Sequence, residues 1–354
     1  MGREEVALRE MMDETGEQVR RGGTGGSGTN GDGKPASAPE PGYMRLHREG
    51  RLSGRAAAMR RLLSRCVMCP RRCRVDRSRG ELGVCGTGSG IEIAAVGIHP
   101  WEEPPISGTR GSGTVFFSGC ALRCVFCQNY PISQMGVGRG FSARELAEAM
   151  LELQAGGAHN INLVTSTHQM AGFLEALVLA VPLGLRVPIV YNTSGYETEE
   201  TLRLLNGIVD IYLPDIKYSD PRTALRYSGC ADYVAFNRRA LLEMWRQVGP
   251  LQTNGDGVAC RGMMVRHLVL PADAAGTRGS FAFLAEHIGP ELWVSLMNQY
   301  FPAHKALNLP PLDRKVTDEE YGDAFRVLSE LEFENGFTQT CSTGDEVDCL
   351  PKMQ

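Results

Sequence analysis

Six short apolar segments recur along the chain, and segments with helical periodicity lie between and after them. Six strand–helix units with short turns predict parallel strands, right-handed crossovers and a buried sheet. Because eight units close a full barrel, six predict an α/β fold, a partial (β/α)6 TIM-like barrel. The expected strands lie at about 114–118, 160–166, 187–194, 209–216, 263–271 and 292–300, and the expected helices at 142–153, 169–183, 199–205, 239–248, 280–288 and 318–331.

Three cysteines follow the first apolar segment after a short turn. Cys120, Cys124 and Cys127 are spaced C-x3-C-x2-C. A zinc site usually takes four ligands from paired C-x2-C knuckles, so this spacing does not describe one zinc site. Three thiols without an obvious fourth predict a cubane iron–sulfur cluster with one iron left open. Three cysteines brought together by chance are the alternative, and the barrel-like pattern around them argues against it.

The spacing of these three cysteines resembles the signature of the radical S-adenosylmethionine (SAM) enzymes. From Cys66 to about His304 the chain is similar to the pyruvate formate-lyase activating enzyme-like branch of that superfamily. The resemblance implies a [4Fe–4S] cluster on Cys120, Cys124 and Cys127, with SAM chelated to the open iron by its amino and carboxylate groups. It also implies oxidoreductase chemistry, in which reductive cleavage of SAM gives a 5′-deoxyadenosyl radical that abstracts a hydrogen atom from a substrate.

Polar residues follow nearly every expected strand. Because the active site of a parallel α/β barrel forms at the C-terminal ends of its strands, they predict the rim of a site. Any one of them alone is more simply a satisfied loop residue. The groups are Thr165-Ser166-Thr167-His168, Asn192-Thr193-Ser194-Gly195-Tyr196, Asp215-Ile216-Lys217-Tyr218, Arg266-His267, and Asn298-Gln299-Tyr300 with His304.

The resemblance narrows this rim to candidate SAM contacts. Ser166-Thr167-His168 stands where the branch usually has a Gly-Gly-Glu turn, and Asn192-Thr193 where it often has Asp-Thr. Asp215 and Lys217 match its D-x-K motif. The resemblance implies no catalytic residue beyond these groups. The candidate cofactor-binding residues are Thr167, His168, Asn192, Thr193, Asp215 and Lys217.

A second group of cysteines precedes the barrel. Cys66, Cys69, Cys73 and Cys85 are spaced C-x2-C-x3-C-x11-C, with a proline and glycines between them. Four thiols in twenty residues predict a closed metal site, and the spacing leaves zinc and a second iron–sulfur cluster open. A cysteine-rich loop without metal is the alternative. Arginines that would offset the charge of four thiolates, or face a partner, are Arg71, Arg72, Arg74, Arg77 and Arg79.

Composition changes along the chain predict four regions. Residues 1–41 are rich in Gly and, near their end, in Pro after a charged start, and they predict a disordered tail. Residues 42–112 predict a helix and the cysteine-rich metal-binding module, ending in a linker-like stretch from Ile91 to Ser112. Residues 113–310 predict the barrel, and residues 311–354 a C-terminal helix and tail.

Charge and hydropathy argue against nucleic-acid and membrane partners, and cysteine usage indicates the cellular compartment. With 37 Lys and Arg against 41 Asp and Glu, the net charge of −4 offers no bulk attraction to nucleic acid or an anionic membrane. No apolar run approaches the ~20 residues that span a bilayer. Eleven cysteines without a secretion signal predict a reducing, cytoplasmic location.

Three functions remain open from the sequence. The first is activation of a glycyl radical enzyme, in which the substrate is a backbone glycine of a partner protein. The second is radical SAM modification of another protein or a small molecule. Either would need an electron donor, such as a flavodoxin- or ferredoxin-like protein. The third, a non-enzymatic iron–sulfur carrier, is disfavoured because a carrier normally completes its cluster with a fourth protein ligand.

Overall fold

The structure is a computed structural model that describes residues 39–339 and 347–349. The tail predicted over residues 1–41 therefore lies almost wholly outside the described residues. Within the described part of the chain, no helix is long and apolar enough to cross a membrane.

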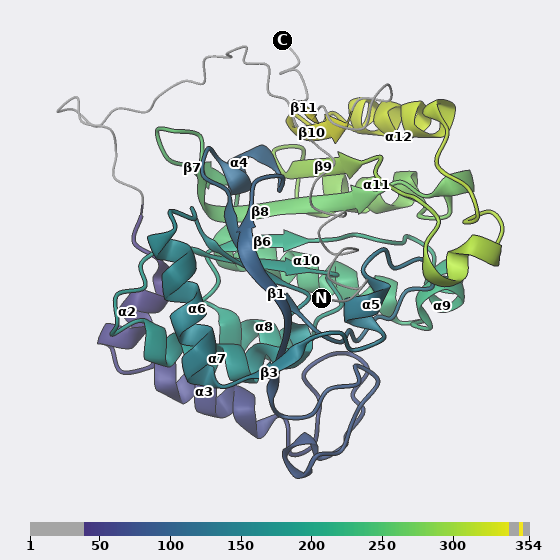
Figure 1. Cartoon of the computed structure of the whole chain (residues 1–354). Coiled ribbons are helices and arrows are strands. Elements are labelled where there is room, and N and C mark those ends of the chain that lie inside the picture. Colours follow the sequence, from purple (N-terminus) through teal and green to yellow (C-terminus); the bar gives the residue numbers. More distant parts are fainter. Residues whose placement is uncertain (1–38, 340–346, 350–354) are drawn as a thin grey trace, which may run out of the picture.

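The six expected strands are all present, and they pair side by side in parallel through the centre of one sheet (Figure 1). Each strand pairs with the next expected strand along the chain. The largely parallel sheet with helices packed against it is a partial TIM-like barrel, which confirms the predicted fold class. The strands are β2 Ser112–Phe117, β4 Ile161–Val164, β5 Ile189–Thr193, β6 Ile211–Pro214, β8 Ala259–Leu268 and β9 Trp293–Met297.

Further strands extend this sheet at both edges. The linker-like prediction for residues 91–112 is wrong, because β1 Ile91–His99 pairs antiparallel with β2 and carries β3 Arg139–Phe141 on its other side. At the opposite edge β10 Asn335–Gln339 runs parallel to β9. Two short antiparallel strands, β7 Gln252–Thr253 and β11 Val347–Cys349, pair with β8 and β10.

Helices occur in all the expected segments. The first begins at a capping box, in which Ser142 and Glu145 exchange side-chain hydrogen bonds with each other's backbone N–H. The helices in these segments are α6 Ala143–Ala155, α7 Met170–Ala180, α8 Glu199–Leu205, α10 Tyr233–Val248, α11 Thr277–His287 and α12 Asp318–Glu330. Other helices are α4 Pro104–Ser107, α5 Tyr130–Ser133 and α9 Pro221–Ser228, with 3₁₀ turns η2 Thr167–Gln169, η3 Pro271–Asp273 and η4 His304–Asn308.

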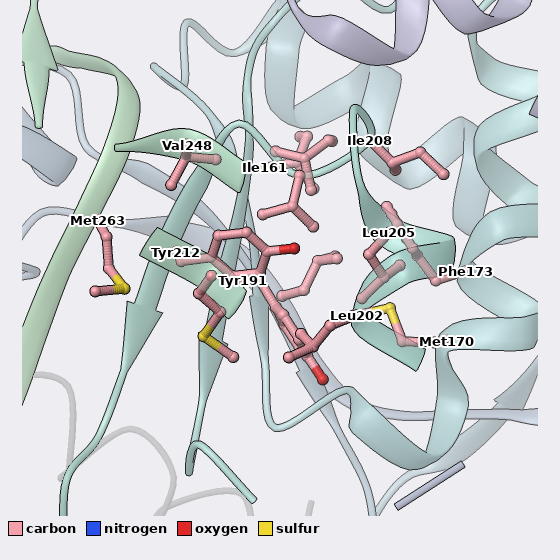
Figure 2. Packing of buried hydrophobic residues seen from close by; sticks show 14 of the residues in the cluster. Ile161, Met170, Phe173, Tyr191, Leu202, Leu205, Ile208, Tyr212, Val248 and Met263 are labelled. Atoms are coloured by element: carbon pink, nitrogen blue, oxygen red, sulfur yellow. The ribbon is translucent and has the colours of Figure 1, made fainter. Parts of the chain in front are cut away.

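The core lies between the sheet and the helices that cover it. Figure 2 shows Tyr191 and Tyr212 of neighbouring strands in one buried cluster with Phe173 of α7 and Leu202 of α8. Each of these side chains is fully buried. Burial of one such side chain contributes roughly 1.5–3 kcal/mol, so the helix-facing side of the sheet is a main source of stability.

The N-terminal segment is part of the same body. Its helices are α2 Gly42–Arg48 and α3 Leu52–Arg61, and α3 packs on α7 and α8 (Figure 1). Asp210 joins the segment to the barrel, because its carboxylate accepts from the backbone N–H of Gly42 at 2.8 Å and of Ile189 at 3.0 Å. Burial raises the pKa of Asp210 to about 7.

Candidate active site

The loop after β2 carries three of the predicted metal-binding thiols. Cys124 is buried, and Cys120 and Cys127 are half-buried. Cys120 Sγ accepts from the backbone N–H of Leu122 at 3.4 Å, and Cys124 Sγ accepts from Ser228 Oγ at 3.1 Å. Burial raises the pKa of Cys124 to about 12, while the nearby Lys217 ammonium acts in the opposite direction. The three thiols also influence one another's charge, so they share one electrostatic environment.

Backbone hydrogen bonds hold this loop in place. Val125 donates to the Tyr227 carbonyl at 2.8 Å, and Gln134 Nε2 donates to the Cys124 carbonyl at 2.8 Å. Arg71 reaches from the cysteine-rich module and donates to the carbonyl oxygens of Ala121 and Leu122, within the loop itself. The loop is therefore fixed from several sides.

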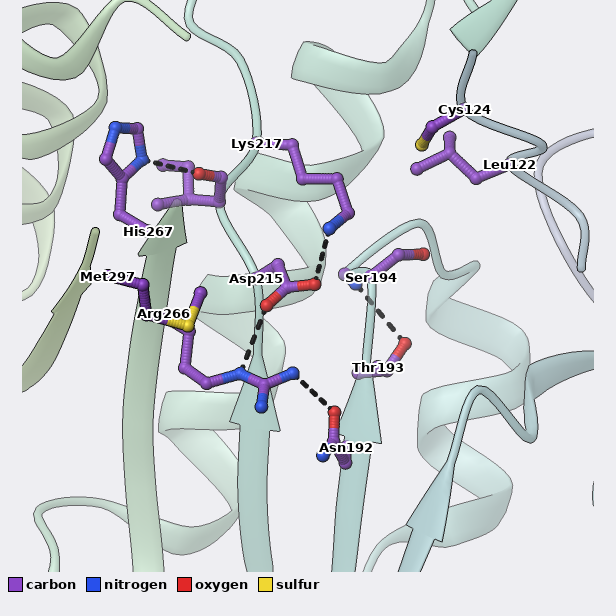
Figure 3. Close-up of polar contacts among 12 residues, drawn as sticks. Leu122, Cys124, Asn192, Thr193, Ser194, Asp215, Lys217, Arg266, His267 and Met297 are labelled. Carbon is purple, nitrogen blue, oxygen red and sulfur yellow. Dashed lines mark hydrogen bonds and ion pairs between the residues drawn. The ribbon is translucent and has the colours of Figure 1, made fainter. Parts of the chain in front are cut away.

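A buried charge network lies at the C-terminal ends of the neighbouring strands (Figure 3). Lys217 Nζ contacts Asp215 Oδ2 at 2.7 Å, and Arg266 Nε contacts Asp215 Oδ1 at 3.1 Å. Arg266 also donates to Asn192 Oδ1 at 2.5 Å and pairs with Glu102 at 3.6 Å. Three predicted residues, Asn192, Asp215 and Lys217, are thus brought together, with Arg266 between them.

The two cations set the protonation of this network. Burial alone would raise the pKa of Asp215, but Lys217 and Arg266 together hold it below its usual value. Asp215 in turn raises the pKa of Lys217, although burial works against the charge. Glu102 is different, because burial and the neighbouring Glu103 raise its pKa to about 7 despite Arg266. The network therefore presents fixed positive groups and one carboxyl that titrates near neutrality.

Thr167 and Thr193 belong to a different cluster. Both hydroxyls donate to Glu197 Oε1, at 2.7 Å and 2.6 Å, and Tyr191 Oη donates to the same oxygen at 2.8 Å. Burial raises the pKa of Glu197 to about 7. The structure therefore places these two threonines with Glu197, apart from the hydrogen-bonded network of Asp215. Their role as SAM contacts stays a prediction.

His168 lies beneath the start of the cysteine loop. Its Nε2 is 2.7 Å from the carbonyl oxygen of Ser118, so this nitrogen carries the proton and donates. Burial lowers the pKa of His168 to about 4, which keeps the ring neutral. His168 therefore supports the backbone that leads into the loop, and its role as a SAM contact also stays a prediction.

The thiols fit an iron–sulfur cluster better than a single ion. Among the described residues, no three His, Cys, Asp or Glu side chains converge closely enough to hold one metal ion as they are placed. Each thiolate of a cubane cluster ligates a different iron, so its ligands surround a volume instead of converging on a point. Cys120, Cys124 and Cys127 lie on one loop, share an electrostatic environment and have the cation Lys217 nearby, which suits an anionic cluster. The donor set therefore fits the group.

Several residues of the site were not predicted as contacts from the sequence. Arg266 was recognised only as a rim residue, and Glu102 lay in the stretch predicted as a linker. Glu197 follows Thr193 by four residues. A carboxyl so close to the end of a buried strand was the sequence feature that could have identified it as a site residue. Ser228 carries no sequence signal, because only the fold brings the end of α9 to Cys124.

The partial parallel barrel carries three loop thiols, which fit an iron–sulfur cluster, and a cation–carboxylate network at its strand ends. Residues 114–250 match the family model of the radical SAM superfamily, so this part of the chain is a radical SAM domain. Members use a [4Fe–4S] cluster and SAM for radical chemistry, which confirms the predicted cofactors.

Three relatives extend this comparison. An uncharacterised protein of Methanocaldococcus jannaschii is 28% identical over 277 residues, which cover 75% of this chain and 75% of that protein. The pyruvate formate-lyase-activating enzyme of Clostridium pasteurianum is 30% identical over 129 residues, or 35% of this chain and 53% of that enzyme. A second uncharacterised M. jannaschii protein is 26% identical over 170 residues, covering 43% of this chain and 49% of that protein.

Proposed function

We propose that the protein cleaves SAM reductively and that the resulting radical abstracts a hydrogen atom from a glycine of a partner protein. The observation that carries the SAM-binding part is the buried network of Asp215, Lys217 and Arg266 beside the Cys124 loop. When bound there, a reduced cluster supplies the electron that breaks the C5′–S bond of SAM. The likeness to an activating enzyme over part of the chain supports the choice of a glycine substrate.

Each residue of the network has a task in this proposal. Lys217 and Arg266 would attract the carboxylate of SAM, since Lys217 lies near Cys124 and Arg266 shares the Asp215 carboxylate with Lys217. Asp215 orients both cations through contacts of 2.7 Å and 3.1 Å. Because Lys217 and Asp215 are each at most a fifth exposed, their interaction with SAM would be little screened by water.

Exposed apolar side chains around the loop support a macromolecular substrate. Met135 and Val137 follow the loop, and Phe301 and Leu307 lie in the segment after β9; their exposed fractions are 69%, 43%, 46% and 59%. The two segments meet at the thiol loop, because the backbone N–H of Lys305 donates to the Val125 carbonyl at 3.0 Å.

Tyr130 also stacks on His304, with ring centroids 4.9 Å apart, so the two segments form one surface beside the loop. Exposed apolar residues that gather at a site are typical of protein-binding surfaces. This surface is where the partner protein would dock.

A second candidate is modification of another protein or a small molecule. The observation that favours it is the turn after β4, where Thr167 donates to Glu197 instead of offering the carboxylate found in the activating-enzyme branch. Either function needs a flavodoxin- or ferredoxin-like electron donor, and the cytoplasmic location stays a prediction.

The first experiment tests SAM cleavage. Protein reconstituted anaerobically with iron and sulfide is reduced with dithionite, and 5′-deoxyadenosine is measured by chromatography. Cys124→Ala should abolish the product, whereas Cys260→Ala, in β8, should retain it. Full cleavage by Cys124→Ala would refute the cluster assignment.

The second experiment separates the two substrates. The reduced enzyme and SAM are incubated with pyruvate formate-lyase or another glycyl radical enzyme, and the radical is sought by electron paramagnetic resonance. A glycyl signal that depends on Cys124 supports the first function. SAM cleavage without a glycyl radical, combined with deuterium transfer from a labelled small molecule into 5′-deoxyadenosine, would support the second.

A further inference from the structure

Four thiols of the cysteine-rich module lie together next to the barrel. Cys66, Cys69 and Cys85 are buried, Cys73 is half-buried, and all four are free. Cys66 Sγ lies 3.8 Å from Arg77, and Cys85 Sγ lies 3.3 Å from Thr87 Oγ1, which accepts from Arg77 at 3.1 Å, so both thiols border one guanidinium. The charges of both thiols also act on Cys69. Cys73 Sγ accepts from the backbone N–H of Val84 at 3.4 Å, which ties it to the turn that leads to Cys85.

A buried arginine lies among these thiols without a carboxylate. Arg77 is only 1% exposed. Its guanidinium donates to the Gly88 carbonyl, to Thr87 Oγ1 at 3.1 Å, to Cys66 Sγ at 3.8 Å and to Met68 Sδ at 3.7 Å. It forms no ion pair within the described part of the chain. A buried cation without a counter-charge is costly, so the position calls for a negative group.

Two polar atoms at the same boundary also lack partners among the described residues. Glu197 Oε2 and His168 Nδ1 are buried and accept no hydrogen bond. The Glu197 carboxyl helps to raise the pKa of Cys69, and the Arg77 guanidinium helps to lower the pKa of His168, so both residues lie near the module. Buried polar atoms of a native protein are nearly always satisfied, so these two call for an ion, a water or a ligand group.

We propose that Cys66, Cys69, Cys73 and Cys85 hold a second metal centre, a zinc ion or an iron–sulfur cluster, whose charge is balanced by Arg77. Each thiol would lose a proton on binding. Four thiolates outnumber the two positive charges of zinc or of an oxidised cubane core, so either centre is anionic. The thiols do not converge on one point as placed, and binding would turn their side chains inward.

The centre would support the loop that carries the first cluster. Arg71 lies between Cys69 and Cys73, and its guanidinium holds the Ala121 and Leu122 carbonyls. The carbonyl oxygen of Cys85 would lie 2.6 Å from a Cβ added at Gly119, so the two backbones touch. A metal that fixes the module therefore also fixes the start of the Cys120 loop.

The test measures metal content, independently of SAM cleavage. A variant with Cys120→Ala, Cys124→Ala and Cys127→Ala is purified anaerobically, and zinc, iron and acid-labile sulfide are counted per chain. The proposal expects about one zinc, or a complete set of cluster iron and sulfide, to remain in this variant. A variant that is folded by circular dichroism and holds neither would overturn it.

If that variant does not fold, the metal content of the parent protein tests the same proposal. About four irons with about one zinc, or about eight irons, would support a second centre, whereas about four irons alone would overturn it. Cys66→Ser and Cys69→Ser should each lose the second metal and keep the first cluster. Cys260→Ala should keep both metals.

The role of Arg77 is tested separately with a matched control. Arg77→Met should release the second metal to a chelator about tenfold faster or more, as expected for loss of a group that supports the ligands. Arg79→Met removes the same charge from the same turn, but Arg79 is 84% exposed and should not change the rate. Equal rates for Arg77→Met and the parent would refute charge balance by Arg77.

Discussion

Replacing Arg266 with methionine tests whether the strand-end network depends on a buried cation. Arg266 contacts Asp215 at 3.1 Å, Glu102 at 3.6 Å and Asn192 at 2.5 Å, and its side chain is 16% exposed. Methionine keeps much of the aliphatic volume and removes the charge. The variant should therefore report mainly on electrostatics.

The expected loss of stability depends on which cations still contact each carboxylate after the substitution. Removing one partner of a buried pair costs about 3–5 kcal/mol, because the other charge stays buried and uncompensated. Asp215 keeps Lys217 at 2.7 Å, so Arg266→Met should destabilise the protein by about 3 kcal/mol near pH 8.

Glu102 makes this loss depend on pH. Its pKa is raised to about 7, and without Arg266 the pKa must rise further. Above pH 7 the native variant then holds a proton that its unfolded state does not, so its stability falls as the pH rises. The parent has already lost that proton. The difference in stability should therefore be smaller by about 1.4 kcal/mol at pH 6 than at pH 8.

The assay is urea unfolding of the metal-free protein at both pH values, followed by circular dichroism. Arg222→Met is the control, since Arg222 forms an ion pair with Asp220 while its own side chain is 92% exposed, and it should leave the midpoint unchanged. A loss below about 1 kcal/mol for Arg266→Met, or a loss that is equal at the two pH values, would refute the reasoning.

Three further predictions concern other parts of the molecule. Lys217→Met should weaken SAM binding about tenfold or more, measured by equilibrium dialysis of the reconstituted protein, and an unchanged affinity would exclude the contact. Gly119→Ala should lower the iron bound on reconstitution, because φ is +84° and the added Cβ would lie 2.6 Å from the Cys85 carbonyl; normal iron content would contradict this. Asp210 has a raised pKa, so between about pH 4 and pH 7 the native parent holds a proton that the unfolded chain releases, and the stability of the parent declines as the pH rises. Asp210→Asn should remove this decline. Parallel pH profiles of stability for the variant and the parent would disprove it.

The strands of the barrel could be predicted because burial on both faces leaves a local signal. Near-continuous apolar runs such as Ile161–Val164 form β4 where the pattern places it. The segment Ile91–His99 was missed as β1 because it contains Gly97 and leads directly into a Trp- and Pro-rich stretch. Its alternating start, Ile91-Glu92-Ile93, was nevertheless a strand signal.

The site could be predicted only where its residues are close in the chain. Asp215 and Lys217 are two residues apart, and they do meet in one ion pair. Asn192 and Thr193 are adjacent, yet successive side chains of a strand point to opposite faces. Asn192 accordingly contacts Arg266, while Thr193 contacts Glu197. Because Asn192 and Thr193 are adjacent in one strand, their side chains lie in different clusters, although the two residues were predicted to act together.

Contacts between distant segments carry no such signal, and Ser228 shows their effect. Its carbonyl oxygen accepts from Arg71 at 2.9 Å, while its hydroxyl donates to Cys124 Sγ at 3.1 Å. Arg71 belongs to the cysteine-rich module, so the module positions a hydrogen-bond donor on a thiol of the first cluster. Hydrogen bonds to cluster sulfurs change reduction potentials. The module would therefore affect a cluster held by Cys124 through Ser228 as well as through the loop backbone, and disturbing the module should alter that cluster's potential even when all three thiols remain.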